Sequence, residues 1–161
     1  MIVPTAAGPN SEEPSSERIP IVWVVEDNLD DEHLTVRALK KTPFEPEIVV
    51  RRDGEQAIQL VKEFANSAPD RIDLPNLVLL DLRLPKASGF EVLQAIRESD
   101  NLKETPVVIL TSSDEPMDVE RAWALDANDY VRKPVDYQGY LAAIASVTNL
   151  WLPASPKASA I

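Results

Sequence analysis

The sequence predicts an α/β fold, a (βα)5 sandwich in which five parallel strands form one sheet with helices on both faces. Its apolar runs are short and continuous, as expected for strands that are buried on both faces of a sheet. The segments between these runs place apolar residues three or four positions apart, the spacing of a helix with one buried face. Strands that alternate with helices join through right-handed crossovers, and such connections give a parallel sheet.

Five segments have the short, β-branched apolar composition of strands. They are residues 19–25 (IPIVWVV), 47–50 (EIVV), 77–80 (LVLL), 106–110 (PVVIL) and 129–132 (DYVR). The fifth is the weakest of them. The carboxyl ends of all five are expected at the same edge of the sheet, because the strands are parallel.

Five helices are predicted between and after the strands, each with a buried face marked by its apolar residues. In chain order these residues are Leu34, Ala38 and Leu39; Ala57, Val61 and Phe64; Phe90, Leu93 and Ile96; Val119, Ala122 and Trp123; and Leu141, Ile144, Val147 and Trp151.

The chain of 161 residues has the length of one ordinary domain with some tail. Hydrophobic residues make up 44% of it, which is enough for a core and argues against global disorder. Residues 1–19 are rich in proline, serine and glutamate, so we expect a mobile N-terminal tail there. A second mobile tail is expected over residues 153–161, which leaves 20–152 as the domain.

Charge and composition exclude several classes of protein. The formal net charge of −11 opposes binding to nucleic acids and to anionic membrane surfaces. The absence of cysteine excludes disulfides, thiolate zinc sites and cysteine nucleophiles. No stretch approaches the roughly 20 apolar residues that span a bilayer, and the N-terminus does not have the pattern of a signal peptide. A cytoplasmic location is therefore expected.

Polar residues follow four of the five predicted strands, at the edge where ligands bind in open α/β sheets. They are Glu26 and Asp27 after the first strand, Asp81 after the third, Thr111 and Ser112 after the fourth, and Lys133 after the fifth. Converging carboxylates repel one another, and a hard divalent cation such as Mg²⁺ relieves the repulsion. A carboxylate beside Mg²⁺, an ammonium and a hydroxyl group is arranged to accept a phosphoryl group.

Each of these residues alone has an ordinary structural explanation. The acid pair suits a helix N-terminus, the hydroxyl residues suit a turn or cap, and a lysine before proline suits a solvated strand end. Their joint appearance at the ends of successive strands favours one functional site.

The order and spacing of these residues resemble the receiver domain of two-component response regulators over residues 20–150. The family has an acid pair after the first strand, a phosphoacceptor aspartate after the third, a threonine or serine ending the fourth, and a lysine before proline after the fifth. Glu26 with Asp27, Asp81, Thr111 and Lys133 match these positions. The resemblance implies a flavodoxin-like sheet with strand order 2-1-3-4-5.

The resemblance also implies a role for each residue. Asp81 would take the phosphoryl group from a histidine kinase, giving an aspartyl phosphate, and Thr111 and Lys133 would contact that group. Mg²⁺ would be held by Glu26, Asp27, Asp81 and the backbone carbonyl of Arg83. The protein would then be a signalling receiver and no conventional enzyme.

Tyr130 matches the aromatic switch position of the family, where it would turn inward as Thr111 moves toward the phosphoryl group. The alternative is a half-buried strand aromatic with no switching role. Asp126 stands where the family usually has glycine, and aspartate tolerates the left-handed backbone conformation better than most residues. Arg83 and Ser112 occupy variable positions that flank the site.

The output of such a switch would come from contacts between proteins, since about ten residues follow the fifth helix. Trp123 on the fourth helix, together with Leu150, Trp151 and Leu152 beyond the expected end of the fifth, is a candidate interface. The alternative is that Trp151 folds back to cap the core.

The segments VEDNLDD, NSAPDRIDLPN and WL are similar to the stand-alone response regulators of bacterial phytochromes, which implies a homodimer and a light-regulated histidine kinase.

Three other functions fit parts of the pattern. A phosphatase of the haloacid dehalogenase type needs a second aspartate two residues after the nucleophile, and Arg83 is there instead. A degenerate receiver that acts only as a binding module would have lost site residues that this chain keeps. A phosphorelay intermediate, which passes its phosphoryl group to a histidine protein, fits as well as an effector does. His33, the only histidine, is expected at the surface of the first helix.

Overall fold

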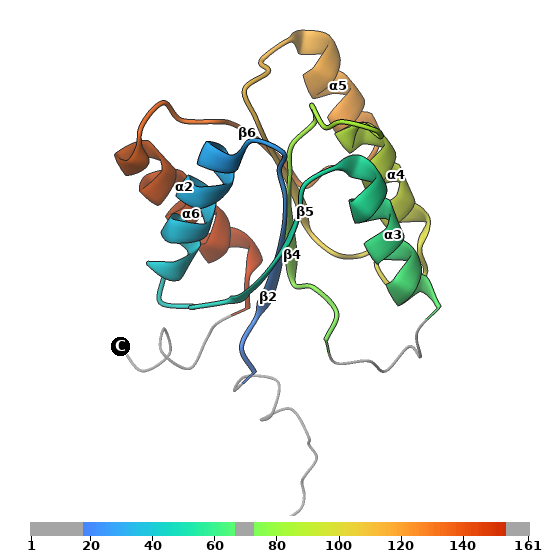
Figure 1. Cartoon of the computed structure of the whole chain (residues 1–161), viewed down its shortest axis with the longest axis horizontal. Helices are drawn as coiled ribbons and strands as arrows, with labels where there is room; N and C mark the ends of the chain where they lie inside the picture. The colour runs from blue at the N-terminus through green and yellow to red at the C-terminus, as the bar shows by residue number, and fades with distance from the viewer. Residues whose placement is uncertain (1–17, 67–72, 154–161) are drawn as a thin grey trace, which may run out of the picture.

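The computed structural model describes residues 18–66 and 73–153, which form one parallel sheet between two layers of helices (Figure 1). The sheet has five strands in the order β3-β2-β4-β5-β6. The strands are β2 (Ile21–Val25), β3 (Glu47–Arg51), β4 (Leu77–Leu80), β5 (Val107–Thr111) and β6 (Asp129–Arg132). Every neighbouring pair is parallel. The predicted flavodoxin-like order 2-1-3-4-5 is confirmed.

Five helices cover the sheet, with α2 and α6 on one face and α3, α4 and α5 on the other (Figure 1). They are α2 (Leu29–Lys40), α3 (Gly54–Ala65), α4 (Gly89–Glu98), α5 (Pro116–Ala124) and α6 (Tyr137–Trp151). Asn28, Asp53, Ser88 and Asp136 cap four of the N-termini with their side chains, and Pro116 opens α5. No helix within the described ranges is long and apolar enough to cross a membrane.

The sheet separates two hydrophobic cores. Because side chains alternate along a strand, Val22 and Val24 of β2 pack toward α2 and α6, and Trp23 and Val25 pack toward the other three helices. The residues of β4 and β5 are all buried, as their continuous apolar runs predicted. The edge strands β3 and β6 are only partly buried.

The structure corrects the predicted end of the last helix. Leu150 and Trp151 lie within α6, which runs to Trp151, so only Leu152 lies past its end. The helical spacing had placed Trp151 on the buried face, and Trp151 does pack partly against the core that α6 covers. The tails predicted over 1–19 and 153–161 fall almost wholly outside the described residues.

Asp126 adopts the left-handed conformation, with φ of 65°, in the turn between α5 and β6. The guanidinium of Arg97 donates two hydrogen bonds to the Asp126 carbonyl, from Nε at 3.0 Å and from Nη2 at 2.8 Å. Arg97 also donates to the Asn128 side chain at 2.7 Å. These bonds hold an aspartate in a turn where glycine is more usual.

Candidate functional site

Three carboxylates meet at the carboxyl edge of the sheet. Glu26 and Asp27 directly follow β2, Asp81 directly follows the neighbouring strand β4, and each offers an oxygen within 4.8 Å of the others. Glu26 and Asp81 are buried, whereas Asp27 is exposed. The adjacency of β2 and β4 in the sheet therefore brings together residues that are 55 positions apart in the chain.

The Lys133 ammonium lies among these carboxylates. Its Nζ is 2.8 Å from Glu26 Oε1, 2.9 Å from Asp81 Oδ2 and 2.8 Å from Asp31 Oδ2, and its side chain is only 7% exposed. Burial alone lowers the pKa of Lys133, but its hydrogen bonds to Asp31, Asp81 and Glu26 outweigh burial and raise that pKa above the ordinary value. Lys133 is therefore a fixed positive charge beside Asp81.

The surroundings of Glu26 disfavour the ionised form of its carboxylate. Burial, with the neighbouring charge of Asp81, raises the pKa of Glu26 to about 7, although hydrogen bonds from Lys133 and from the Asn28 amide act in the opposite direction. A cation beside Glu26 would favour its ionised form. Three clustered carboxylates are a donor set of oxygens, which hard divalent cations such as Mg²⁺ prefer. The residues present therefore fit the predicted cation.

Backbone contacts fix the position of Asp81. Its amide donates to the Val25 carbonyl at 3.1 Å, and the amide of Arg83 donates to Asp81 Oδ1 at 3.2 Å. Gly89, the first residue of α4, packs against the other side of the Asp81 backbone. A side chain has no room there, because a Cβ on Gly89 would lie 2.2 Å from the Asp81 carbonyl oxygen.

We expect Gly89→Ala to lower the free energy of unfolding by about 1–3 kcal/mol, since the added methyl group must push the backbone of Asp81 or α4 aside. Urea denaturation followed by circular dichroism measures this. Ala95→Gly offers a comparison on the same helix, because it changes backbone entropy without crowding Asp81 and should cost only about 0.5–1 kcal/mol. A Gly89→Ala protein as stable as the wild type would contradict the close packing.

Thr111 and Tyr130 lie on adjacent strands near the site. Thr111 ends β5 and is fully buried, and its Oγ1 accepts a hydrogen bond of 3.4 Å from the Ser113 amide. Tyr130 of β6 is half-buried, and its hydroxyl donates to the Ser113 carbonyl at 2.9 Å. Burial is the main reason that the pKa of Tyr130 is raised. Both side chains thus contact the segment that joins β5 to α5.

The side chains of Arg83 and Ser112 are exposed at the rim of the site. The Arg83 guanidinium pairs with Asp118 of α5, and the Ser113 hydroxyl donates to the same carboxylate at 2.6 Å. The loop after Asp81 is therefore tied to the first turn of α5 by an ion pair that the sequence did not suggest.

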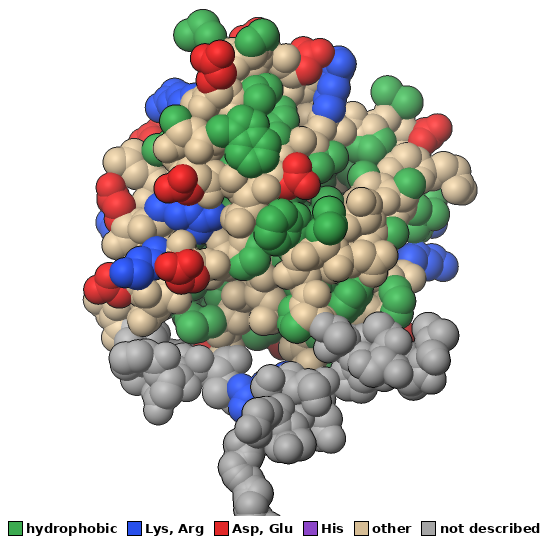
Figure 2. All heavy atoms as spheres, turned by 180° about the vertical axis from the view of Figure 1, so that it is seen from behind, with side chains coloured by type: hydrophobic (Ala, Val, Ile, Leu, Met, Phe, Trp, Pro, Cys, Tyr) green, Lys and Arg blue, Asp and Glu red, His purple; other side chains and the backbone are tan. Residues whose placement is uncertain are grey.

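The four candidate interface residues are not equally available. Trp123 is 47% exposed and Leu150 is 66% exposed, whereas Leu152 is buried and Trp151 is half-buried. In the space-filling view from behind, apolar side chains lie between acidic and basic ones over the face shown (Figure 2). Trp123 and Leu150 are thus the two of these residues that a partner can reach readily.

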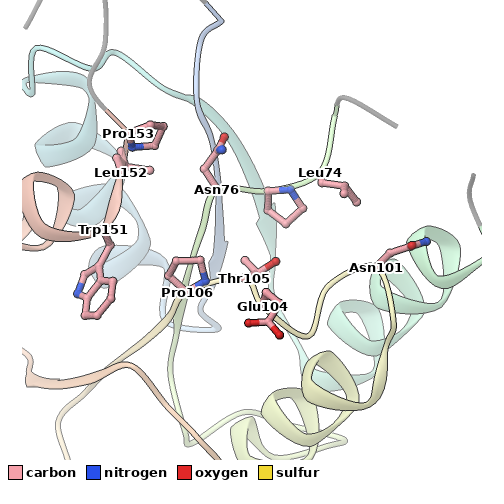
Figure 3. A pocket seen from close by; sticks show the side chains of 10 residues that line it. Leu74, Asn76, Asn101, Glu104, Thr105, Pro106, Trp151, Leu152 and Pro153 are labelled. Atoms are coloured by element: carbon pink, nitrogen blue, oxygen red, sulfur yellow. The ribbon is translucent and has the colours of Figure 1, made fainter. Parts of the chain in front are cut away.

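Trp151 and Leu152 border a pocket of about 550 Å³ at the opposite edge of the sheet from the carboxylates (Figure 3). Leu74 and Asn76 before β4, and Thr105 and Pro106 before β5, form its other sides. Its lining contains a single charged residue, Glu104. This pocket lacks the convergent charges that distinguish the edge around Asp81.

Asp31 is a member of the site that the sequence did not reveal. It lies in the first turn of α2, where acidic residues are common because they complement the helix dipole. Three acidic residues occur in that turn, Asp30, Asp31 and Glu32, and no feature of the sequence distinguishes the one that reaches Lys133. Lys133 lies 102 positions further along the chain.

Comparison with known proteins identifies relatives over most of the chain. The family described as the response regulator receiver domain matches residues 22–145. Response regulator Rcp1 from Synechocystis is 34% identical over 135 residues, which are 82% of this chain and 88% of Rcp1. The structure of its Mn²⁺-bound form has a TM-score of 0.72 at 33% identity and covers 86% of this chain and 98% of the other.

Two further solved structures have similar folds. The phosphorylated cyanobacterial phytochrome response regulator RcpA has a TM-score of 0.75 at 32% identity, covering 86% of this chain and 97% of its own. The bacteriophytochrome response regulator RtBRR is 39% identical, with a TM-score of 0.66 and coverage of 88% and 89%.

Proposed function

The chain belongs to the response regulator receiver family, and from this premise we propose that Asp81 accepts a phosphoryl group from a histidine kinase. The observation that carries the proposal is the position of the Asp81 carboxylate, which lies between two other carboxylates and the Lys133 ammonium. A purely structural aspartate would not require the Lys133 ammonium and two further carboxylates beside it. The phosphorylated form would then signal through contacts with other proteins.

The proposed transfer is a displacement at phosphorus. A carboxylate oxygen of Asp81 forms a bond to phosphorus while the bond from phosphorus to the donor's histidine nitrogen breaks, and the electron pair of that bond returns to the imidazole. The product is an acyl phosphate on Asp81 and a free histidine on the kinase. The Lys133 ammonium stabilises the negative charge of the phosphoryl oxygens during this step.

Glu26, Asp27, Asp81 and the backbone carbonyl of Arg83 would hold Mg²⁺. The fit of the donor set supports this assignment, as does the Mn²⁺-bound form of Rcp1, a relative of this chain. A bound divalent cation would neutralise charge on the phosphoryl oxygens.

We expect Asp27→Asn to weaken Mg²⁺ binding by at least about tenfold, because it removes one of the three clustered charges. Isothermal titration calorimetry measures the dissociation constant. Asp27 is exposed, so the variant should fold as the wild type does. Asp30→Asn, an exposed change three residues along the chain, is the matched control. If both variants weakened Mg²⁺ binding equally, the loss would reflect the overall negative charge of the region, and Asp27 would not be a ligand of the cation.

Thr111 and Tyr130 would form the conformational switch. The Thr111 hydroxyl would hydrogen-bond the phosphoryl group, and Tyr130 would leave its hydrogen bond with the Ser113 carbonyl to turn inward. Because Ser113 also contacts Asp118, this movement would alter the start of α5. A change at α5 would reach Trp123, which is exposed on the same helix.

The proposed phosphoryl donor is a phytochrome histidine kinase, because RcpA and RtBRR are both described as response regulators of phytochromes. A cytoplasmic homodimer, with Trp123 and Leu150 as candidate contacts and residues 20–152 as the receiver domain, completes the proposal. Incubation with Mg²⁺ and acetyl phosphate, followed by intact-mass measurement, tests the central step. A Mg²⁺-dependent gain of one phosphoryl group supports it, whereas an unchanged mass in a folded, Mg²⁺-binding protein would favour a binding module.

A further inference from the structure

The Lys133 ammonium has no spare hydrogen in this structure. An ammonium carries three N–H donors, and Glu26, Asp31 and Asp81 each accept one of them. To contact a phosphoryl group on Asp81, Lys133 must exchange at least one of these bonds. The question is which carboxylate keeps Lys133 in place during that exchange.

Asp31 differs from the other two carboxylates in its surroundings. Glu26 and Asp81 belong to the cluster with Asp27, where a divalent cation would compete with Lys133 for their oxygens. Asp31 lies outside that cluster, on the α2 side of the ammonium. Its backbone is also fixed, because its amide donates to the Asn28 side chain at 2.9 Å. Asp31 therefore remains available to Lys133 when a cation engages the others.

Tyr140 of α6 fixes the Asp31 side chain. Tyr140 is 1% exposed, and its hydroxyl hydrogen-bonds the Asp31 carboxylate. Asp31, Lys133 and Tyr140 together border one hollow next to the site. One turn earlier on the same helix, the hydroxyl of the half-buried Tyr137 has no hydrogen-bond partner among the residues that the structure describes. Of the two tyrosines in the first turn of α6, only the fully buried Tyr140 therefore contacts Asp31.

We infer that Asp31, held by Tyr140, is a positioning residue that keeps the Lys133 ammonium beside Asp81 while Glu26 and Asp81 engage the cation and the phosphoryl group. This role rests on the proposed function and adds two residues to it. The anchor joins three elements, since Asp31 lies on α2, Lys133 follows β6, and Tyr140 lies on α6. Without Asp31 and Tyr140, the Lys133 ammonium would have no fixed partner once Glu26 and Asp81 bind the cation and the phosphoryl group.

The test measures the initial rate of phosphorylation by acetyl phosphate at saturating Mg²⁺. We expect Asp31→Ala to lower this rate between about tenfold and a hundredfold, because the ammonium loses its fixed position. Asp31→Asn keeps an acceptor oxygen and should lose less. Tyr140→Phe should lower the rate by about fivefold or more, because it removes one hydrogen bond to the Asp31 carboxylate. The dissociation constant for Mg²⁺ should change by about fivefold or less, since Asp31 is outside the cluster.

A second measurement needs neither cation nor phosphoryl donor. In the presence of EDTA, nitrogen-15 NMR should show the Lys133 ammonium hydrogens of the wild type protected from solvent exchange, and faster exchange in Asp31→Ala and Tyr140→Phe. Tyr137→Phe is the matched control, because it removes a hydroxyl without a partner from the same helix, and it should match the wild type in both measurements.

The outcomes separate this inference from the function on which it rests. Wild-type rate and wild-type protection in Asp31→Ala would overturn the anchor and leave Asp81 as the phosphoacceptor. Equal losses in Tyr137→Phe and Tyr140→Phe would overturn the role of Tyr140, because they would indicate general loosening of α6. If the wild type takes up no phosphoryl group, the proposed function fails, and the exchange measurement still decides whether Asp31 anchors Lys133.

Discussion

Asp81→Asn is expected to abolish the Mg²⁺-dependent gain of one phosphoryl group from acetyl phosphate. The carboxamide of asparagine is a poor nucleophile for phosphorus, and no other carboxylate shares the position of Asp81. Glu26 is buried and paired with Lys133, and Asp27 is exposed at the outer side of the cluster. Intact-mass measurement after incubation with Mg²⁺ and acetyl phosphate gives the phosphorylated fraction, which should fall to background.

The variant should remain folded, which makes the loss interpretable. Lys133 keeps Glu26 and Asp31 as partners, and removal of one buried carboxylate relieves repulsion, so the free energy of unfolding should change by about 1 kcal/mol or less. Asp100→Asn, at a side chain that is 96% exposed, is the matched control and should be phosphorylated as fully as the wild type. A wild-type mass gain in Asp81→Asn would place the acceptor elsewhere.

Lys133→Met is expected to cause the largest loss of stability. The substitution keeps much of the side-chain volume but removes the positive charge from three carboxylates, two of which are buried. Removing one member of a buried ion pair costs about 3–5 kcal/mol, because the remaining charge is left without compensation. Urea denaturation in the presence of EDTA should show a loss of this size.

Mg²⁺ distinguishes electrostatic from packing effects in this variant. A cation held by the carboxylate cluster would replace part of the missing charge, so Mg²⁺ should recover more stability in Lys133→Met than it adds to the wild type. Lys62→Met, an exposed substitution on α3, should change stability by about 0.5 kcal/mol or less. A Lys133→Met protein as stable as the wild type in EDTA would show that the carboxylates do not need the ammonium.

The fold and most of the site could be predicted because both depend on regular features of the chain. Continuous apolar runs indicated buried parallel strands, and the residues after those runs had to meet at one edge. The clustering of Glu26, Asp27 and Asp81 with Lys133 follows from that geometry. The end of the last helix was predicted too early, before Leu150, although the helical spacing of Ile144, Val147 and Trp151 continues to Trp151, where α6 ends.

Contacts between side chains from distant elements could not be predicted in this way. The sequence marks Asp31 only as one of three acids in a helical turn, and Tyr140 only as one of two tyrosines at the start of a helix. The pairing of Arg83 with Asp118 depends on how the loop after β4 and the first turn of α5 approach each other. Such contacts are set by the rotation and packing of whole helices, which no short pattern encodes.

The sequence by itself determined the alternation of strands and helices, the edge at which the site lies, and the residues that carry its charge. Those properties follow from periodicity and position, which are local and repeat along the chain. Only the tertiary structure decided which acid reaches Lys133, which tyrosine finds a partner, and which tryptophan remains exposed. Each of these depends on shifts of a few ångströms between packed elements. A hydrogen bond or an ion pair forms only when its two atoms come within a short distance of each other.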